Sequence, residues 1–164
     1  MMEVRSIEAI VKMLNDAGVK YLIVGGLAVN AHGFVRLTRD MDIVLQLKRP
    51  NILRALKVLA KAGFQLAIPE KLEVFADAKI RARWRREKNM ITLKLWSDKH
   101  QRTPIDIFIY EPFDFAKELA KVHAQEIAPE IVAPVVSLKT LLRMKRAAGR
   151  PQDLEDIREL KSIQ

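Results

Sequence analysis

The strongest constraint on the fold of this chain lies in residues 21–47, YLIVGGLAVNAHGFVRLTRDMDIVLQL. Its first apolar run predicts a buried strand that ends at Gly25 and Gly26. Glycines between a strand and a helix permit a turn that side chains would block, and their N–H groups can bind an anion such as phosphate. Asp40 and Asp42 open the second run at i and i+2, so in a strand both side chains project from one face. Because adjacent carboxylates repel each other and hard cations are their usual partners, the stretch predicts a magnesium-nucleotide site.

A third aspartate, Asp106, lies in a later apolar run, PIDIFIY, where isoleucines alternate with other side chains. A carboxylate at the start of such a strand is costly to bury unless a cation meets it. Together with Asp40 and Asp42 it supplies the third carboxylate of a two-metal phosphoryl-transfer site. An alternative needs no ligand: Asp40 caps a turn, and Asp42 pairs with Arg36 or Arg39.

Hydrophobic periodicity predicts an α/β (α+β) fold, with a small mixed sheet flanked by helices and a C-terminal helical pair. Helices are expected at 6–17, 27–32, 51–62, 114–120, 138–148 and 152–163, and strands at 19–24, 41–47, 64–68, 89–96 and 104–110. Residues 123–136 contain two prolines and are expected to form brief extended pieces. The last helix is expected to point Leu154 inward.

The composition fits one globular domain of 164 residues, with a core at about 19–112 and a C-terminal helical part at about 113–164. The chain is 49% hydrophobic and has no cysteine, so neither a disulfide nor a Cys-based zinc site can form. Charges interrupt the first apolar stretch and no run is long enough to span a bilayer, which favours a cytoplasmic protein. The three histidines, His32, His100 and His123, lack metal-ligand spacing and are expected in packing or surface roles.

The net charge is +9, from 29 Lys and Arg against 20 Asp and Glu. Such an excess attracts polyanions such as nucleotides or nucleic acids, although many small proteins and thermophile proteins carry it on solvated faces. The densest basic segment, at about 77–88, is rich in Ala, Arg, Lys and Glu and favours a helix over a strand. Trp84 would face the core, as we also expect for Trp96. One outward stripe would hold three candidates for contact with an RNA backbone: Arg81, Arg85 and Lys88.

These motifs together resemble the nucleotidyltransferase superfamily that includes DNA polymerase β. The resemblance lies in GG-x₁₃-D-x-D followed by a strand aspartate, and the detail GG-LAVNAHG-x-x-R-x-T-x-D-x-D is similar to small bacterial and archaeal members related to AbiEii-type toxins. The run at 142–157, LRMKRAAGRPQDLEDI, resembles the second motif of that group, a Lys followed by Arg-Pro-x-Asp and a further acid. The resemblance spans roughly residues 20–160.

The resemblance implies a role for each matching residue. Asp40 and Asp42 would bind Mg²⁺ (or Mn²⁺) that holds the triphosphate, and Asp106 would join one metal and assist deprotonation of the acceptor hydroxyl. The nucleotide-binding set would be Gly25, Gly26, Arg36, Thr38, Lys145, Arg150 and Asp153. Without the family pattern, Lys145, Arg150 and Asp153 are equally well interpreted as a salt-bridge set at a helix end.

Two positions depart from the family. In many members the second glycine is followed or replaced by a serine that touches phosphate, whereas here Leu27 follows Gly26. Gln152 stands where relatives often have Lys. The resemblance implies an enzyme that transfers a nucleoside monophosphate from an NTP to a hydroxyl of an RNA end (such as tRNA), a protein or a small molecule. It also implies a toxin with a cognate antitoxin. The alternative is a catalytically silent domain that binds nucleic acid or a partner protein.

Overall fold

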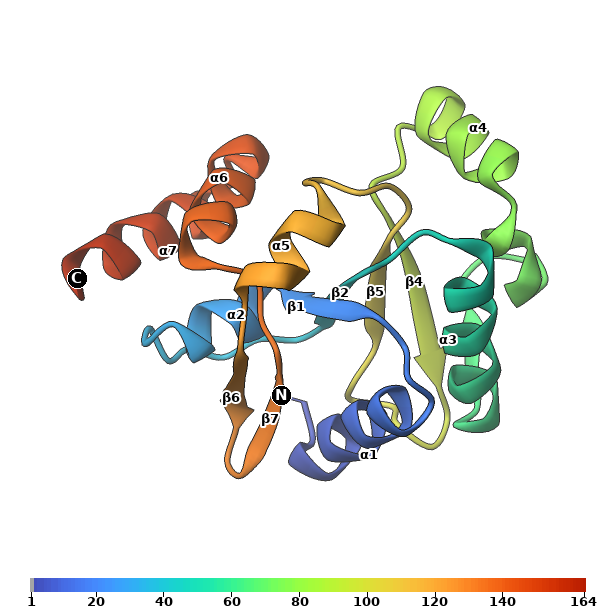
Figure 1. Ribbon diagram of the computed structural model, residues 1–164, viewed down its shortest axis with the longest axis horizontal. Coiled ribbons are helices and arrows are strands. Elements are labelled where there is room, and N and C mark those ends of the chain that lie inside the picture. The colour runs from blue at the N-terminus through green and yellow to red at the C-terminus, as the bar shows by residue number, and fades with distance from the viewer. Residues whose placement is uncertain (1) are drawn as a thin grey trace.

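A five-stranded mixed sheet and a separate two-stranded hairpin form the strand framework of the protein (Figure 1). The computed structural model describes residues 2–164. The main sheet contains β1 (Tyr21–Val24), β2 (Met41–Leu45), β3 (Phe64–Leu66), β4 (Thr92–Ser97) and β5 (Ile105–Phe108), in the spatial order β1-β2-β5-β4-β3. β2 and β5 run parallel, and the other neighbouring pairs run antiparallel. The predicted small mixed sheet is confirmed.

The predicted helices are also present. They are α1 (Val4–Asp16), α2 (Gly25–Ala31), α3 (Arg49–Lys61), α4 (Ala78–Lys88), α5 (Phe115–Lys121), α6 (Leu138–Ala148) and α7 (Pro151–Ser162), with a short 3-10 helix, η1 (Leu72–Ala76), before α4. The clearest difference is at α2, which begins at Gly25, so the glycine pair forms its first turn instead of preceding it. Within residues 2–164, no helix combines the length and apolar character needed to cross a membrane.

The segment expected as brief extended pieces is a hairpin of β6 (Ala124–Ala128) and β7 (Ile131–Pro134). The chain that leaves β7 then lies along β1: Val135 forms a bridge with Ile23, and the Val136 N–H donates to the Ile23 carbonyl at 3.0 Å. His32 Nε2 bonds the Val136 carbonyl at 2.8 Å. The hairpin therefore closes the outer edge of β1 and leads the chain into α6, above the sheet (Figure 1).

One face of the main sheet belongs to the core. Its buried side chains are Met41, Ile43, Leu45, Leu93, Leu95, Ile105 and Ile107. Helices α1 and α3 pack against each other and cover this face with their own apolar sides (Figure 1). Because side chains alternate along a strand, Asp42, Asp106 and Lys94 project from the opposite face.

Three predicted side-chain placements are wrong. Arg81, expected to face outward, is 7% exposed, because η1 packs on α4 and the Phe75 carbonyl accepts a hydrogen bond from its guanidinium at 2.7 Å. Trp96, expected in the core, is 41% exposed on the polar side of β4, and Leu154 is 57% exposed on α7. Trp84 is buried as predicted.

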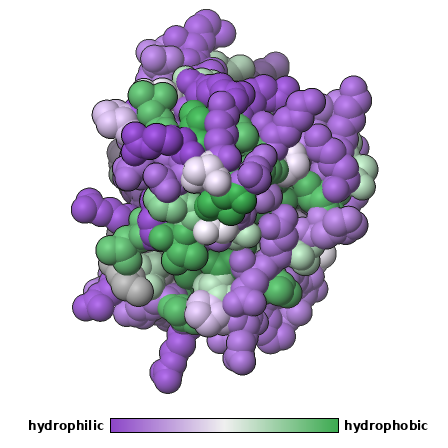
Figure 2. All heavy atoms as spheres, turned by 90° about the vertical axis from the view of Figure 1, so that its left-hand side faces the viewer, coloured by the Kyte–Doolittle hydropathy of each residue, from purple (hydrophilic) through white to green (hydrophobic). Residues whose placement is uncertain are grey.

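The expected packing and surface roles of the other two histidines are confirmed. His100 stacks on the Phe64 ring at a centroid distance of 5.6 Å, and its Nδ1 lies 2.8 Å from the Ser6 hydroxyl. His123 is exposed. Seen from the side of the C-terminal helices, hydrophilic side chains cover most of the surface and hydrophobic ones gather near its middle (Figure 2).

Asn51, in the first turn of α3, joins that helix to the ends of β1 and β2. It is 2% exposed; its Oδ1 accepts from the Lys20 N–H at 2.8 Å, and its Nδ2 donates to the carbonyls of Lys20 and Gln46 at 2.9 Å each. Asn51→Ala removes the partner of the Lys20 N–H and of the Gln46 carbonyl, while the Lys20 carbonyl still accepts from the Gln46 N–H. We therefore expect it to lower the free energy of unfolding by roughly 2–4 kcal/mol, measured by denaturant titration. The exposed Gln65→Ala serves as control and should stay within about 0.5 kcal/mol of the parent. Equal effects for the two variants would contradict this role.

Candidate active site

The register of the sheet places three charged side chains in one row. Asp42 on β2 is paired with Asp106 on β5, and Asp106 is paired in turn with Lys94 on β4. On its other side Asp42 is paired with Val24, the residue before Gly25 and α2. Paired residues on neighbouring strands project from the same face. The two carboxylates are therefore neighbours across the sheet, beside the start of α2.

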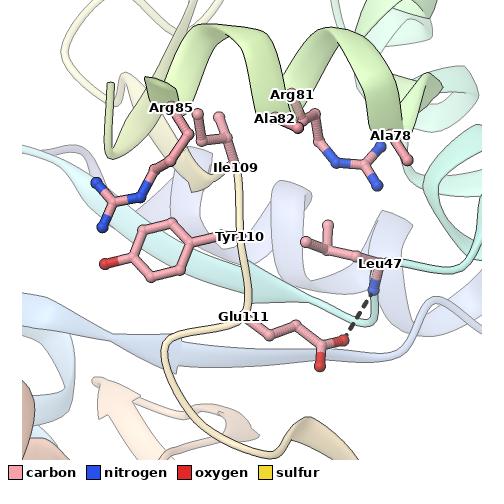
Figure 3. A pocket seen from close by; sticks show the side chains of 8 residues that line it. All are labelled: Leu47, Ala78, Arg81, Ala82, Arg85, Ile109, Tyr110 and Glu111. Carbon is pink, nitrogen blue, oxygen red and sulfur yellow. Dashed lines mark hydrogen bonds between the residues drawn. The ribbon is translucent and has the colours of Figure 1, made fainter. Parts of the chain in front are cut away.

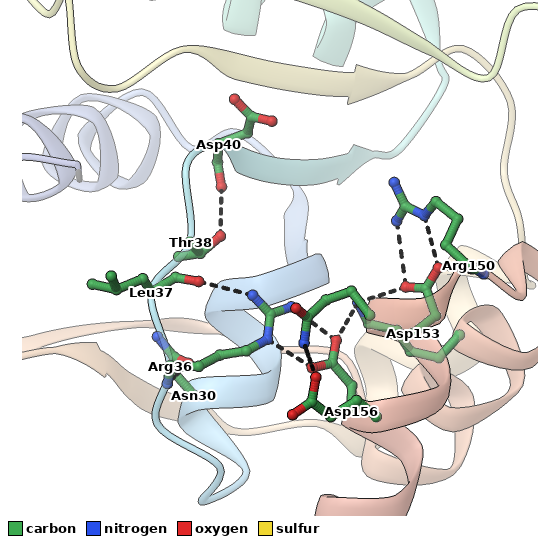
Figure 4. Close-up of polar contacts among 11 residues, drawn as sticks. Asn30, Arg36, Leu37, Thr38, Asp40, Arg150, Asp153 and Asp156 are labelled. Atoms are coloured by element: carbon green, nitrogen blue, oxygen red, sulfur yellow. Dashed lines mark hydrogen bonds and ion pairs between the residues drawn. The ribbon is translucent and has the colours of Figure 1, made fainter.

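This row opens into a cleft of about 830 Å³ between the sheet and the C-terminal helices. Its lining includes every predicted catalytic and nucleotide-binding residue: Gly25, Gly26, Arg36, Thr38, Asp40, Asp42, Asp106, Lys145, Arg150 and Asp153. Residues from both halves of the sequence thus meet in one cavity. Figure 4 shows Arg36, Thr38 and Asp40 on the connector between α2 and β2, with Arg150 and Asp153 from α7 and the turn before it across from them.

The surroundings of Asp42 and Asp106 disfavour the ionised form of each carboxylate. Burial raises the pKa of Asp42 to about 7, and Asp106 and Asp40 add to the rise, although Lys145 and Lys94 oppose it. Burial also raises the pKa of Asp106, against the effect of Lys94. Asp106 Oδ1 is buried and makes no hydrogen bond within the described chain, although the Lys94 ammonium lies 3.2 Å away. The site therefore favours additional positive charge.

Lys94 is a site residue that the sequence analysis missed. Its ammonium lies 3.3 Å from Asp40 Oδ1 and 3.2 Å from Asp106 Oδ1, so it lies between the two carboxylates. In the sequence, Lys94 alternates with Leu93 and Leu95, a pattern that puts it on the polar side of the strand. The pairing of β4 with β5, which brings Lys94 to Asp106, was the missing information.

Both glycines of the pair are required by close approaches. Gly25 has a φ of +65°, and a Cβ built on it would collide with the Asp42 carboxylate. A Cβ on Gly26 would collide with the Thr38 hydroxyl. Because neither glycine has a side chain, the backbone at the start of α2 can lie against the Asp42 carboxylate and the Thr38 hydroxyl.

A buried charge network joins the C-terminal helices to the connector before β2 (Figure 4). Lys145 Nζ lies 3.0 Å from Asp153 Oδ1 and 2.9 Å from Asp156 Oδ2. Arg36 donates to both oxygens of Asp156 at 2.6 and 2.8 Å, and Arg150 Nε donates to Asp153 Oδ2 at 2.7 Å. Burial alone would raise the pKa of both aspartates, but these cations hold each pKa below its ordinary value. The network keeps α6 and α7 over the cleft.

The network decides between the interpretations left open by the sequence. Arg36 pairs with Asp156, so the alternative that pairs it with Asp42 is wrong. The salt-bridge interpretation of Lys145, Arg150 and Asp153 describes real contacts, but the same side chains line the cleft. Asp156 was missed as their partner. Its spacing of three residues from Asp153, on one helix face, was the available signal.

The candidates for nucleic-acid contact are dispersed. Arg85 stacks on the Tyr110 ring, 4.1 Å from its centroid, and both residues line the cleft and also a second pocket of about 450 Å³ (Figure 3). Tyr110 in turn packs edge-on to Phe108. Arg81 is buried, as described above, and Lys88 is exposed at the end of α4 and lines neither cavity.

The donor set fits a hard divalent cation, but it is not assembled into a cluster. Asp40, Asp42 and Asp106 offer carboxylate oxygens, which Mg²⁺ and Mn²⁺ prefer, and Asp106 Oδ1 is buried without a hydrogen bond. Within residues 2–164, no group of three or more His, Asp or Glu side chains is gathered closely enough to form a ready-made metal site.

Solved structures of nucleotidyltransferases share this fold. Lincomycin-bound LnuA, a lincosamide antibiotic adenylyltransferase, is 15% identical, with a TM-score of 0.64 over 99% of each chain. ANT(2″)-Ia in complex with adenylyl-2″-tobramycin is 13% identical, with a TM-score of 0.58 over 98% of this chain and 89% of the other. A candidate nucleotidyltransferase from Thermotoga maritima is 14% identical, with a TM-score of 0.56 over 100% and 97%.

No protein-family model matches the sequence, and no curated protein matches it. At 13–15% identity, the structural similarity establishes the fold alone. The predicted nucleotidyltransferase fold is therefore confirmed. The resemblance to AbiEii-type members stays a prediction.

The raised pKa of Asp42 has a consequence for stability. An aspartate with an ordinary pKa of 3.8 in the unfolded chain and about 7 in the folded chain costs nothing at low pH, costs more as the pH rises between these values, and carries the full cost above about pH 7. Asp42→Asn removes this cost. In the presence of a chelator, we expect it to raise the free energy of unfolding by roughly 2–4 kcal/mol at about pH 8 and by progressively less as the pH falls toward about 4.

Thermal melts across this pH range measure the effect. The exposed Asp98→Asn serves as the matched control and should change the melting temperature little at any pH. A melting temperature for Asp42→Asn equal to that of the parent at about pH 8 would show that burial does not disfavour the ionised carboxylate.

Proposed function

We propose that this chain is a Mg²⁺-dependent (or Mn²⁺-dependent) nucleotidyltransferase, which transfers a nucleoside monophosphate from an NTP to a hydroxyl acceptor and releases pyrophosphate. The observation that carries the proposal is the pairing of Asp42 with Asp106 on parallel strands, beside the start of α2, in a cleft lined by both predicted motifs. Two proteins with this fold support it: LnuA is a lincosamide antibiotic adenylyltransferase, and ANT(2″)-Ia is bound to adenylyl-2″-tobramycin.

The carboxylates would divide the chemistry between them. Held by Asp40, Asp42 and Asp106, the divalent cation would neutralise phosphate charge and lower the pKa of the acceptor hydroxyl. Asp106 would also accept the proton of that hydroxyl, through the carboxylate oxygen that does not bind the cation. The hydroxyl oxygen forms a bond to the α-phosphorus as the bond to the leaving pyrophosphate breaks.

The phosphates would lie against Gly25 and Gly26, with Thr38 beside them. Leu27, at the position where relatives have a serine, is 3% exposed and belongs to the core. The Thr38 hydroxyl, which lies where a Gly26 Cβ would be, supplies a hydroxyl beside the glycine pair. We therefore assign to Thr38 the phosphate contact that Leu27 lacks.

Positive charge for the triphosphate would come from the C-terminal helices. The Arg150 side chain is 75% exposed and bonded to Asp153 on one side, so it can also contact a phosphate. Lys145 is 7% exposed and held by Asp153 and Asp156, so it would act from a fixed position. Its charge already lowers the pKa of Asp42 against the stronger effect of burial.

The acceptor would approach past Arg85 and Tyr110, which line both the cleft and the second pocket. The net charge of +9 and the exposed basic side chains of α4 favour a nucleic-acid acceptor, such as the end of a tRNA. The lincomycin of LnuA and the tobramycin of ANT(2″)-Ia favour a small molecule that bears hydroxyls. One assay with both classes of acceptor distinguishes them.

Incubation with α-phosphate-labelled NTPs and Mg²⁺, with total RNA in one arm and lincomycin or tobramycin in others, tests the proposal. We expect label transfer that falls by at least about 100-fold in Asp106→Asn, because that variant loses both a metal ligand and a proton acceptor. Asp98→Asn, exposed and outside the cleft, should keep full transfer. Absence of transfer to every acceptor, together with absence of metal-dependent NTP binding, would instead favour a silent binding module.

A further inference from the structure

The Lys94 ammonium contacts Asp40 and Asp106, two of the carboxylates that would bind the proposed metal. It is 3.3 Å from Asp40 Oδ1 and 3.2 Å from Asp106 Oδ1. Lys94 and Asp106 are paired across β4 and β5, so the register of these strands places the two side chains next to each other. Lys94 is therefore a built-in counter-cation for the carboxylates.

This position conflicts with a divalent cation. Magnesium binds carboxylate oxygens at about 2.0–2.1 Å and demands a nearly octahedral shell of oxygen atoms. An ion that contacts Asp40 Oδ1 and Asp106 Oδ1 would lie within about 5 Å of an ammonium that contacts the same atoms, where like charges repel strongly. The ammonium and the metal therefore compete for the two carboxylates.

Lys94 is able to leave. Its side chain is 47% exposed, and its hydrogen bonds at this site are made to Asp40 and Asp106 through the end of a flexible four-carbon chain. Thr92, on the same face of β4, lines the cleft, so the strand that carries Lys94 borders the space expected to hold the nucleotide. A triphosphate in that space would offer the ammonium a partner of higher charge than a carboxylate.

We propose that Lys94 makes the metal site conditional on nucleotide: it occupies Asp40 and Asp106 in the free protein and moves to phosphate when an NTP enters with its metal. The inference rests on the proposed function for the identity of the incoming ligand, and on the Lys94 contacts for the competition. Metal and nucleotide would then bind with positive coupling, because each favours the displaced position of the same side chain. Lys94 acts here as a positioning residue.

Binding of Mn²⁺ alone, followed by the loss of the free-ion EPR signal, tests the competition without any catalytic readout. We expect Lys94→Met to bind Mn²⁺ at least about tenfold more tightly than the parent in the absence of nucleotide, because it removes a competing charge. Lys94→Arg keeps the charge and should stay within about threefold of the parent. Lys99→Met, in the exposed loop after β4, is the matched control and should leave the affinity unchanged.

A second measurement adds a non-hydrolysable NTP. The analogue should tighten Mn²⁺ binding to the parent protein by a larger factor than to Lys94→Met, since only the parent has an ammonium to displace. An affinity of Lys94→Met for Mn²⁺ equal to or weaker than that of the parent would overturn the inference, as would equally tight binding by Lys94→Arg. Thermal melts verify that each variant is folded at the assay temperature.

The outcomes separate this inference from the proposed function. Tighter Mn²⁺ binding by Lys94→Met without NMP transfer to any acceptor would support the competition and contradict the enzyme. Transfer activity in the parent with unchanged Mn²⁺ binding in Lys94→Met would support the enzyme and contradict the competition.

Discussion

The site depends on one constraint, the negative charge that the parallel pairing of β2 and β5 concentrates at a single row of the sheet. Asp42 and Asp106 are register partners, and Asp40 lies on the connector just before β2. Carboxylates so close together and partly buried disfavour joint ionisation, and burial with this repulsion raises the pKa of Asp42 to about 7. The surrounding structure supplies positive charge from two directions, by Lys94 on β4 and by Lys145 on α6.

These two lysines differ in the way they are held. Lys145 lies between Asp153 and Asp156, and Arg36 closes the network from the connector before β2, so its charge is fixed as part of the packing of α6 and α7. Removing one member would leave a buried charge without a partner, which is strongly destabilising. Lys94 is half-exposed and bonded to Asp40 and Asp106 themselves. The aspartates thus meet one cation that is fixed by packing and one that can be displaced.

Much of the fold was predictable because the chain is locally consistent. The alternation in β4 and β5, the glycine after α6 and the Ser137 N-cap each predict the element that forms. The predictions that were wrong concern burial, which depends on distant segments. Arg81 is buried because η1 packs on α4, and Trp96 is exposed on the side of β4 opposite the buried Leu93 and Leu95.

The sequence by itself determined which chemical groups are present: a glycine pair after an apolar run, three aspartates at the starts of two later apolar runs, and a Lys and an Arg-Pro-x-Asp near the C-terminus. Their spacing within each element is local and needs no partner strand. Only the tertiary structure decided that β5 pairs with β2 on one side and β4 on the other, which sets Lys94 against Asp106, and that Arg36 pairs with Asp156. The physical reason is that strand order and ion-pair choice arise from contacts between residues far apart in the chain, which local periodicity does not encode.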